Sequence, residues 1–107
     1  MDEKRTSPRR RAFLVGKIIY GGETYTIDCT IRDLSETGAR VKVRDPYSIP
    51  NNIVFLDPKN FNAYETSVKW RKGTEMGLSF DRRIPLEDET NPRVRILRRV
   101  SLQARAS

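Results

Sequence analysis

The stretch TYTIDCTIRDLSETGARVKVR, residues 24–44, determines the fold. Ahead of the central DLSETG turn, every second residue is apolar: Tyr25, Ile27, Cys29 and Ile31. After the turn the alternation returns, with Ala39, Val41 and Val43 set against Arg40, Lys42 and Arg44. A period of two is typical of a β-strand with one buried face and one solvated face. We therefore predict two strands joined by a turn over 33–38, with Cys29 as a small core residue.

Similar patterns predict short strands on both sides of this stretch, at 12–20, 53–56, 65–71 and 76–80. The segment 45–52 carries two prolines and two asparagines, which should prevent regular structure there. Six short strands separated by turn residues indicate a small antiparallel barrel or sandwich.

A helix is expected at the C-terminal end, over 92–104, after a linker at 81–91. Thr90 or Asn91 can cap it, and Pro92 is allowed in the first turn. Its apolar stripe would hold Val94, Ile96, Leu97 and Val100. We expect this stripe to cover an open end of the barrel, with the helix arginines in solvent. The alternative is a basic amphipathic element that binds a membrane surface or a partner.

Composition narrows the classes of function. The chain has 107 residues, one Cys, no His and a net charge of +7. This length suits one domain, and the charge points to an anionic partner. Without His, the usual Ser–His and Cys–His nucleophiles are absent, and one Cys forms neither an internal disulfide nor a thiolate zinc site. We assign no catalytic residue, no metal and no cofactor. The sequence shows no apolar run of membrane-spanning length and no secretion signal, so a cytoplasmic location is expected.

Two clusters of residues could bind a ligand. The first is a basic arm at 1–11, in which Arg5 and Arg9 form R-x-x-x-R. The second is Asp33, Ser35 and Gly38, which form D-x-S-x-x-G between two strands. Each has an ordinary structural explanation when taken alone. The arm could be a solvated tail, and the second cluster a hairpin connection in which Gly38 takes a conformation that other residues avoid.

Taken together, and with Gly77-Leu78-Ser79-Phe80 ending the last strand, these clusters resemble the PilZ domain family over roughly residues 4–80. The resemblance implies an all-β fold, a six-stranded antiparallel barrel at 12–80 followed by a C-terminal helix. It also implies binding of the bacterial second messenger cyclic di-GMP, with the flexible arm folding against the barrel. The ligand residues that it implies are Arg5, Arg9, Arg10, Arg11, Asp33, Ser35 and Gly38.

The chemistry of these residues suits such a ligand. A guanidinium can donate two parallel hydrogen bonds to guanine O6 and N7, or stack on the base. Asp33 can accept from guanine N1–H and N2–H₂, and Ser35 can add a hydroxyl bond. Motif spacing favours Arg5 with Arg9, whereas nearness to the first strand favours Arg10 or Arg11. Trp70 is a weaker candidate for base stacking, because its alternation with Val68 favours a place in the core.

Three functions remain open at this point. The first is a non-enzymatic cyclic di-GMP receptor that regulates a protein partner in motility, adhesion or polysaccharide output. The second is an adaptor of the same fold that no longer binds nucleotide. The third is a basic barrel that binds RNA or DNA, which is weaker because the solvated faces lack the interleaved aromatic residues that stack on bases. An enzyme is the least supported class.

Overall fold

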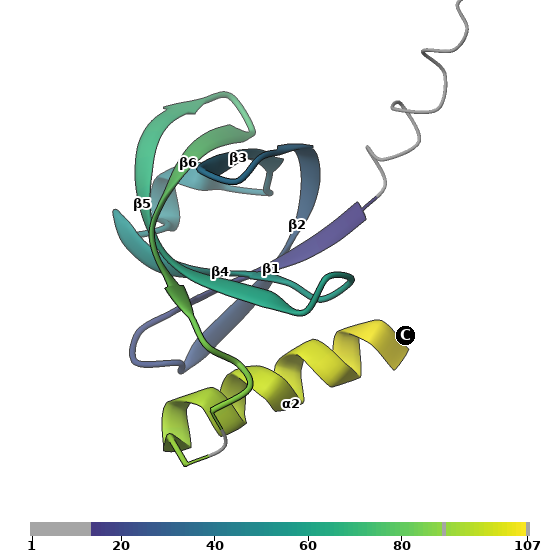
Figure 1. The fold of residues 1–107 in the computed structure, drawn as a ribbon. Helices are drawn as coiled ribbons and strands as arrows, with labels where there is room; N and C mark the ends of the chain where they lie inside the picture. The colour runs from purple at the N-terminus through teal and green to yellow at the C-terminus, as the bar shows by residue number, and fades with distance from the viewer. Residues whose placement is uncertain (1–13, 89, 107) are drawn as a thin grey trace, which may run out of the picture.

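The computed structural model describes residues 14–88 and 90–106, with side chains to residue 104. They form a closed six-stranded antiparallel barrel followed by one C-terminal helix, which confirms the predicted fold class (Figure 1). The elements are β1 Leu14–Tyr20, β2 Tyr25–Leu34, β3 Gly38–Lys42, η3 Pro46–Ser48, β4 Asn52–Asp57, β5 Asn62–Lys72, β6 Glu75–Ile84 and α2 Pro92–Ala106. The strand order is β1-β2-β3-β6-β5-β4, and pairing of β1 with β4 closes the ring.

Several elements extend past their predicted ends. β6 continues to Ile84, four residues beyond Phe80, so the first part of the predicted linker belongs to this strand. Its extension pairs with β5, where Ala63 lies opposite Ile84. A single 3-10 turn also forms over 46–48, inside the segment predicted to lack regular structure, where Asp45 accepts a bond from the Tyr47 backbone N–H. The helix begins at Pro92 as expected and ends two residues later than predicted.

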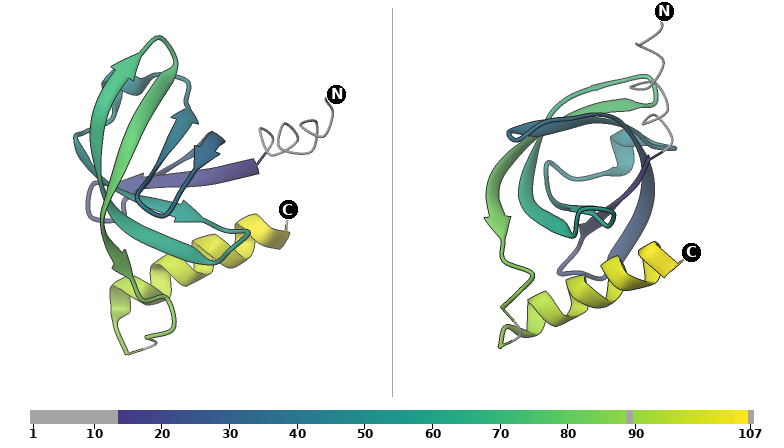
Figure 2. Two further views of the ribbon diagram at one scale, coloured as in Figure 1. Left: turned by 45° about the horizontal axis from the view of Figure 1, so that its top comes forward. Right: turned by 45° about the vertical axis from the view of Figure 1, so that its right-hand side comes forward.

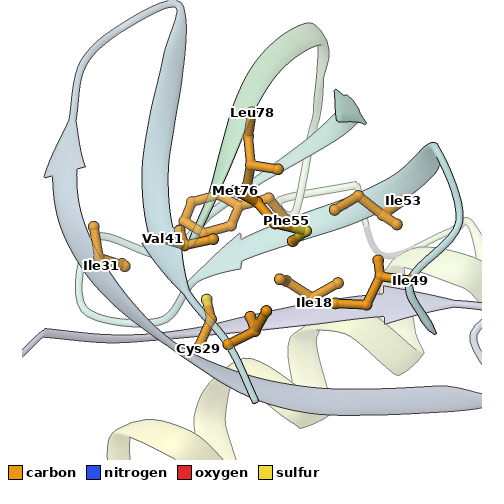
Figure 3. Close-up of a cluster of buried hydrophobic side chains, with 10 residues drawn as sticks. Ile18, Cys29, Ile31, Val41, Ile49, Ile53, Phe55, Met76 and Leu78 are labelled. Carbon is orange, nitrogen blue, oxygen red and sulfur yellow. The ribbon is translucent and has the colours of Figure 1, made fainter. Parts of the chain in front are cut away.

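The first core fills the barrel (Figure 3). Alternating residues of β1, β2, β3, β4 and β6 supply most of it, as the sequence pattern predicts, while β5 contributes the partly buried Tyr64 and Val68. Its buried members are Ile18, Cys29, Ile31, Val41, Val43, Ile49, Ile53, Phe55, Met76 and Leu78. Cys29 is a core residue, as predicted, and its burial raises the pKa of the thiol to about 12. At neutral pH the thiol is therefore protonated and chemically inert.

A second core lies between the outer wall of the barrel and α2. Ile19 on β1, together with Val54 and Leu56 on β4, faces outward and packs with Val94 and Leu97 of the helix. The expectation that α2 covers an open end of the barrel is therefore wrong: the helix runs along the outside of the wall (Figures 1 and 2). The reason lies in β1 and β4, which carry apolar residues on both faces, so their outer face also needs a cover.

The buried face of α2 follows the helical period more strictly than predicted. Val94, Leu97 and Ser101 are buried at i, i+3 and i+7, whereas Ile96 is 44% exposed. Ile96 was expected in the apolar stripe, but it precedes Leu97 by one residue, which places it about 100° around the helix. Within the described residues, no helix is long and apolar enough to cross a membrane.

Two helix arginines make hydrogen bonds to the rest of the domain instead of remaining in solvent as expected. Arg93 donates to Glu23 at 2.9 Å and to Glu65 at 3.1 Å, which ties the helix start to the β1–β2 turn and to β5. Arg98 donates to the backbone carbonyl of Leu86 at 2.7 Å. Hydrogen bonds from Arg82 and then from Arg93 hold the pKa of Glu65 below its ordinary value.

Candidate ligand-binding site

Asp33 lies at the outer end of β2, not in the turn where the sequence placed it. The β2–β3 register shifts between Ile31 and Asp33, and after this bulge Asp33 faces Arg40 of β3. The Asp33 side chain is 67% exposed, and its Oδ2 accepts a bond of 2.6 Å from Arg40 Nε. The bulge therefore turns the carboxylate toward the outer face of the barrel, beside a guanidinium.

Arg40 connects three neighbouring strands. Besides its bond to Asp33 on β2, its Nη1 donates to Glu75 Oε1 at the start of β6, at 3.0 Å. Hydrogen bonds to Asp33 and then to Glu75 raise the pKa of the guanidinium. Sequence reasoning missed Arg40 and Glu75 as site residues. The alternation of 38–44 placed Arg40 on a solvated face, but only the strand register places it against Asp33.

Ser35 organises the turn that follows β2. Its backbone N–H donates to the carbonyl of Gly38 at 2.9 Å, while its Oγ accepts from the N–H groups of Thr37 and Gly38, each at 3.2 Å. These are the side-chain to backbone bonds expected of serine in a turn. The hydroxyl remains at the exposed surface, so it can also meet a ligand.

Gly38 is required for a different reason from the one predicted. Its backbone is not in the left-handed region, which Gly21, Gly22 and Gly73 adopt. A Cβ at Gly38 would instead lie 2.2 Å from the carbonyl oxygen of Leu78 on β6. The missing side chain thus permits β3 and β6 to approach closely where the turn begins.

The motif residues meet at one open cavity of about 420 Å³ on the outer face. The cavity is lined by Asp33, Leu34, Ser35, Thr37, Gly38, Ala39, Arg40, Leu78 and Ser79. A larger hollow of about 700 Å³ lies across the barrel, between the β1–β2 turn and the start of α2. Its charged side chains include Glu23, Glu65, Arg82 and Arg93, which already pair with one another. The smaller cavity therefore offers the better set of ligand-binding groups.

Trp70 is not a core residue, so the preferred prediction for it is wrong. The β5–β6 register shifts between Val68 and Trp70, and the bulge turns Trp70 to the outer face, where it is 43% exposed. Its ring lies over Gly77, where a Cβ would meet the indole Nε1 at 2.0 Å. Gly77 also faces Arg40 across β3 and β6, so Trp70 and Arg40 flank the same glycine.

The four arginines of the basic arm, Arg5, Arg9, Arg10 and Arg11, lie outside the described residues. The described chain begins at Leu14, which pairs with Ile31 on β2, two residues before Asp33. The first described residue of β1 therefore lies close to the end of β2 that carries the Asp33–Arg40 pair.

The closed barrel thus places a carboxylate, a hydroxyl and a guanidinium around one open cavity. Among residues 14–88 and 90–106, no group of three His, Cys, Asp or Glu side chains gathers as metal ligands. The family model of the PilZ domain matches residues 3–102, and the chain belongs to this family. PilZ domains are non-enzymatic receptors associated with cyclic di-GMP. No protein of curated function and no solved structure matches the chain.

Proposed function

We propose that this chain is a receptor for cyclic di-GMP, without catalytic activity of its own. The observation that carries the proposal is that Asp33, Ser35 and Gly38 line one open cavity. This cavity lies near the start of β1, the strand that follows the basic arm in the sequence. The ligand has two guanines and two phosphates, which suits a site that combines the Asp33 carboxylate with several arginines.

The length of the arm lets each of its arginines reach this cavity. A chain spans at most about 3.3–3.6 Å per residue, so from Leu14 the α-carbon of Arg11 can lie up to about 10 Å away. The same rule gives about 17 Å for Arg9 and about 30 Å for Arg5. These distances cover a dinucleotide seated at the adjacent end of β2. Arginine suits this role because its planar fork can bind a phosphate or the O6/N7 edge of guanine.

The barrel supplies the groups that recognise the base. Asp33 accepts from guanine N1–H and N2–H₂, and Ser35 adds its hydroxyl. Trp70, exposed on the same outer face beyond Gly77, offers a ring on which the second guanine can stack. A guanine donates through N1–H and N2–H₂ and accepts through O6 and N7, so the carboxylate and the arm arginines bind different atoms of the base.

The magnitudes are sufficient for a signalling receptor. Micromolar affinity corresponds to about 8 kcal/mol. Four or five hydrogen bonds to charged groups, at roughly 1.5–3 kcal/mol each, reach this value after the cost of ordering the arm. The ordered arm would then present a new surface to a cytoplasmic protein partner that acts in motility, adhesion or polysaccharide output.

Calorimetric titration of the whole chain with cyclic di-GMP tests the proposal. We expect saturable binding to the wild type and at least tenfold weaker binding to Arg9→Ala and Asp33→Ala. Arg44→Ala is the matched control, because it removes one exposed positive charge after β3, outside the cavity lining. Absence of binding by the wild type at high micromolar ligand would reject the function. Binding that is indifferent to Asp33→Ala would retain the function and reject this site.

A further inference from the structure

Asp33 and Arg40 present an acceptor and a donor side by side on the cavity wall. Arg40 Nε donates to Oδ2 of Asp33, and Arg40 Nη1 donates to Glu75. Among the described residues, Oδ1 of Asp33 and Nη2 of Arg40 take part in neither bond. Asp33 and Arg40 both line the cavity that Ser35 and Gly38 also line. The pair therefore retains one unused guanidinium nitrogen and further acceptor capacity on the carboxylate, at Oδ1 and at the second lone pair of Oδ2.

We infer that the Asp33–Arg40 pair reads guanine as a unit, with Arg40 donating to O6 while Asp33 accepts from N1–H and N2–H₂. This inference rests on the cyclic di-GMP binding proposed above. The Watson–Crick edge of guanine carries two neighbouring donors and then one acceptor. An acceptor followed by a donor on the protein matches that order. Adenine presents N1, an acceptor, toward the carboxylate and its amino group, a donor, toward the guanidinium, so both contacts become unfavourable.

Glu75 makes this edge rigid before any ligand arrives. Asp33 lies opposite Arg40 in the β2–β3 register, and Arg40 lies opposite Gly77 in the β3–β6 register, close to Glu75. The guanidinium is thus held from two sides by carboxylates on neighbouring strands, at 2.6 and 3.0 Å. A donor that is already oriented loses little side-chain freedom on binding, which favours affinity and selectivity together.

Arg40 would act on the ligand differently from the arm arginines. It belongs to β3 and would reach the base from the barrel wall, whereas the arm arginines precede Leu14 in the sequence. Guanine O6 has two lone pairs, so it can accept from Arg40 and from an arm arginine at the same time. The arm would provide most of the phosphate contacts, and the wall pair would decide which base is accepted.

Titration of the whole chain with three cyclic dinucleotides tests this division of roles. The ligands are cyclic di-GMP, cyclic di-IMP, which keeps O6 and N1–H but lacks the 2-amino group, and cyclic di-AMP. The variants are Arg40→Ala and Arg40→Met, which retains the aliphatic stem, with Arg44→Ala as the control for charge. We expect both Arg40 variants to bind cyclic di-GMP and cyclic di-IMP about tenfold more weakly, by the same factor, because both bases offer O6. Binding of cyclic di-AMP should stay weak in both variants, because the Asp33 carboxylate still faces adenine N1, so the preference for guanine narrows.

Several results would overturn the inference while leaving the receptor function intact. Unchanged or tighter binding of cyclic di-GMP by both Arg40 variants would make Arg40 a bystander or a competitor for Asp33. A larger loss for cyclic di-GMP than for cyclic di-IMP would mean that Arg40 only orients Asp33, which makes two bonds to guanine and one to hypoxanthine. An equal loss of affinity in Arg44→Ala would show that the effect comes from the net positive charge of the protein and not from the position of Arg40. Absence of wild-type binding would reject the proposed function itself.

Discussion

Replacing Gly38 with alanine should lower the stability of the barrel through one backbone contact. A Cβ at this position would lie 2.2 Å from the carbonyl oxygen of Leu78, about 1.2 Å short of ordinary van der Waals contact at 3.4 Å. The opposing atom is backbone in the middle of β6, so a change of rotamer cannot relieve the clash. β3 and β6 must move apart where Thr37 and Phe80 share a backbone hydrogen bond of 2.9 Å.

The size of the effect follows from this geometry. Inserting one carbon into a well-packed contact costs about 1–3 kcal/mol when the surroundings must shift. For a domain of this length, that loss lowers the melting temperature by roughly 5–15 °C. The turn at Ser35 accepts and donates through the backbone of Gly38, so ligand affinity should fall with stability.

Gly77→Ala provides the matched comparison in thermal melting followed by circular dichroism. Its Cβ would also be very close to a neighbour, 2.0 Å from Trp70 Nε1, but this neighbour is the end of a side chain that can rotate away. We expect a smaller loss of stability than in Gly38→Ala. We also expect a red shift in fluorescence, because Trp70 is the sole tryptophan of the sequence and its ring would enter solvent.

A melting temperature of Gly38→Ala within about 2 °C of the wild type would show that the contact with Leu78 does not limit stability. An equal loss of stability in Gly38→Ala and Gly77→Ala would show that a clash with backbone costs no more than a clash with a movable side chain.

Three further predictions concern the two cores and the ion pairs. The Cys29 thiol should react with an aromatic disulfide reagent only as the protein unfolds, because its pKa is about 12 and it is buried; reaction at the rate of free cysteine would contradict this. Leu97→Ala should lose about 2–5 kcal/mol of unfolding free energy in denaturant titration, whereas the exposed neighbour variant Ile96→Ala should change it by less than about 0.5 kcal/mol. The pKa of Glu65 is lowered in the folded state, mainly by Arg82, so its stabilising effect is present above its ordinary pKa of 4.5 and is lost as the pH falls through the lower folded value. Melting temperatures should therefore separate the wild type from Glu65→Gln at pH 7, and the difference should shrink as the pH falls below 4.5; a constant difference would refute the ion-pair account.

Strand identity could be predicted because alternation reports which side of a strand is buried. The pattern from Ile27 to Ile31 predicted the solvated and buried faces of β2, and it placed Cys29 inside the barrel, whereas Tyr25 at the start of the strand is exposed. The same pattern could not reveal a bulge, which adds one residue to one strand and reverses every side chain beyond it. For this reason Trp70 was assigned to the core, although it lies on the outer face.

The sequence predicted that Asp33 and Ser35 belong to one candidate site, but it did not predict that Arg40 and Glu75 pair with Asp33 there. Asp33 and Ser35 form a local motif, so their neighbourhood could be inferred from spacing alone. Arg40 is seven residues from Asp33, and Glu75 is a further thirty-five residues along the chain. Only the register of β2, β3 and β6 brings the three together. The position of α2 could not be predicted for a related reason. An apolar stripe shows that one face of a helix is buried, but not which surface of the barrel it packs against.

The place where α2 lies has a practical consequence for anyone who shortens this chain. β1 and β4 join through a short seam, Lys17 with Leu56, Ile18 with Phe55 and Ile19 with Val54, and α2 packs over its outer side. A fragment that stops before Pro92 would expose the apolar outer side chains of β1 and β4 along this seam. It would also weaken the packing of β1, the strand that follows the arm. Such a fragment should aggregate in storage and give misleadingly poor ligand titrations, so the helix belongs in every expressed version of the protein.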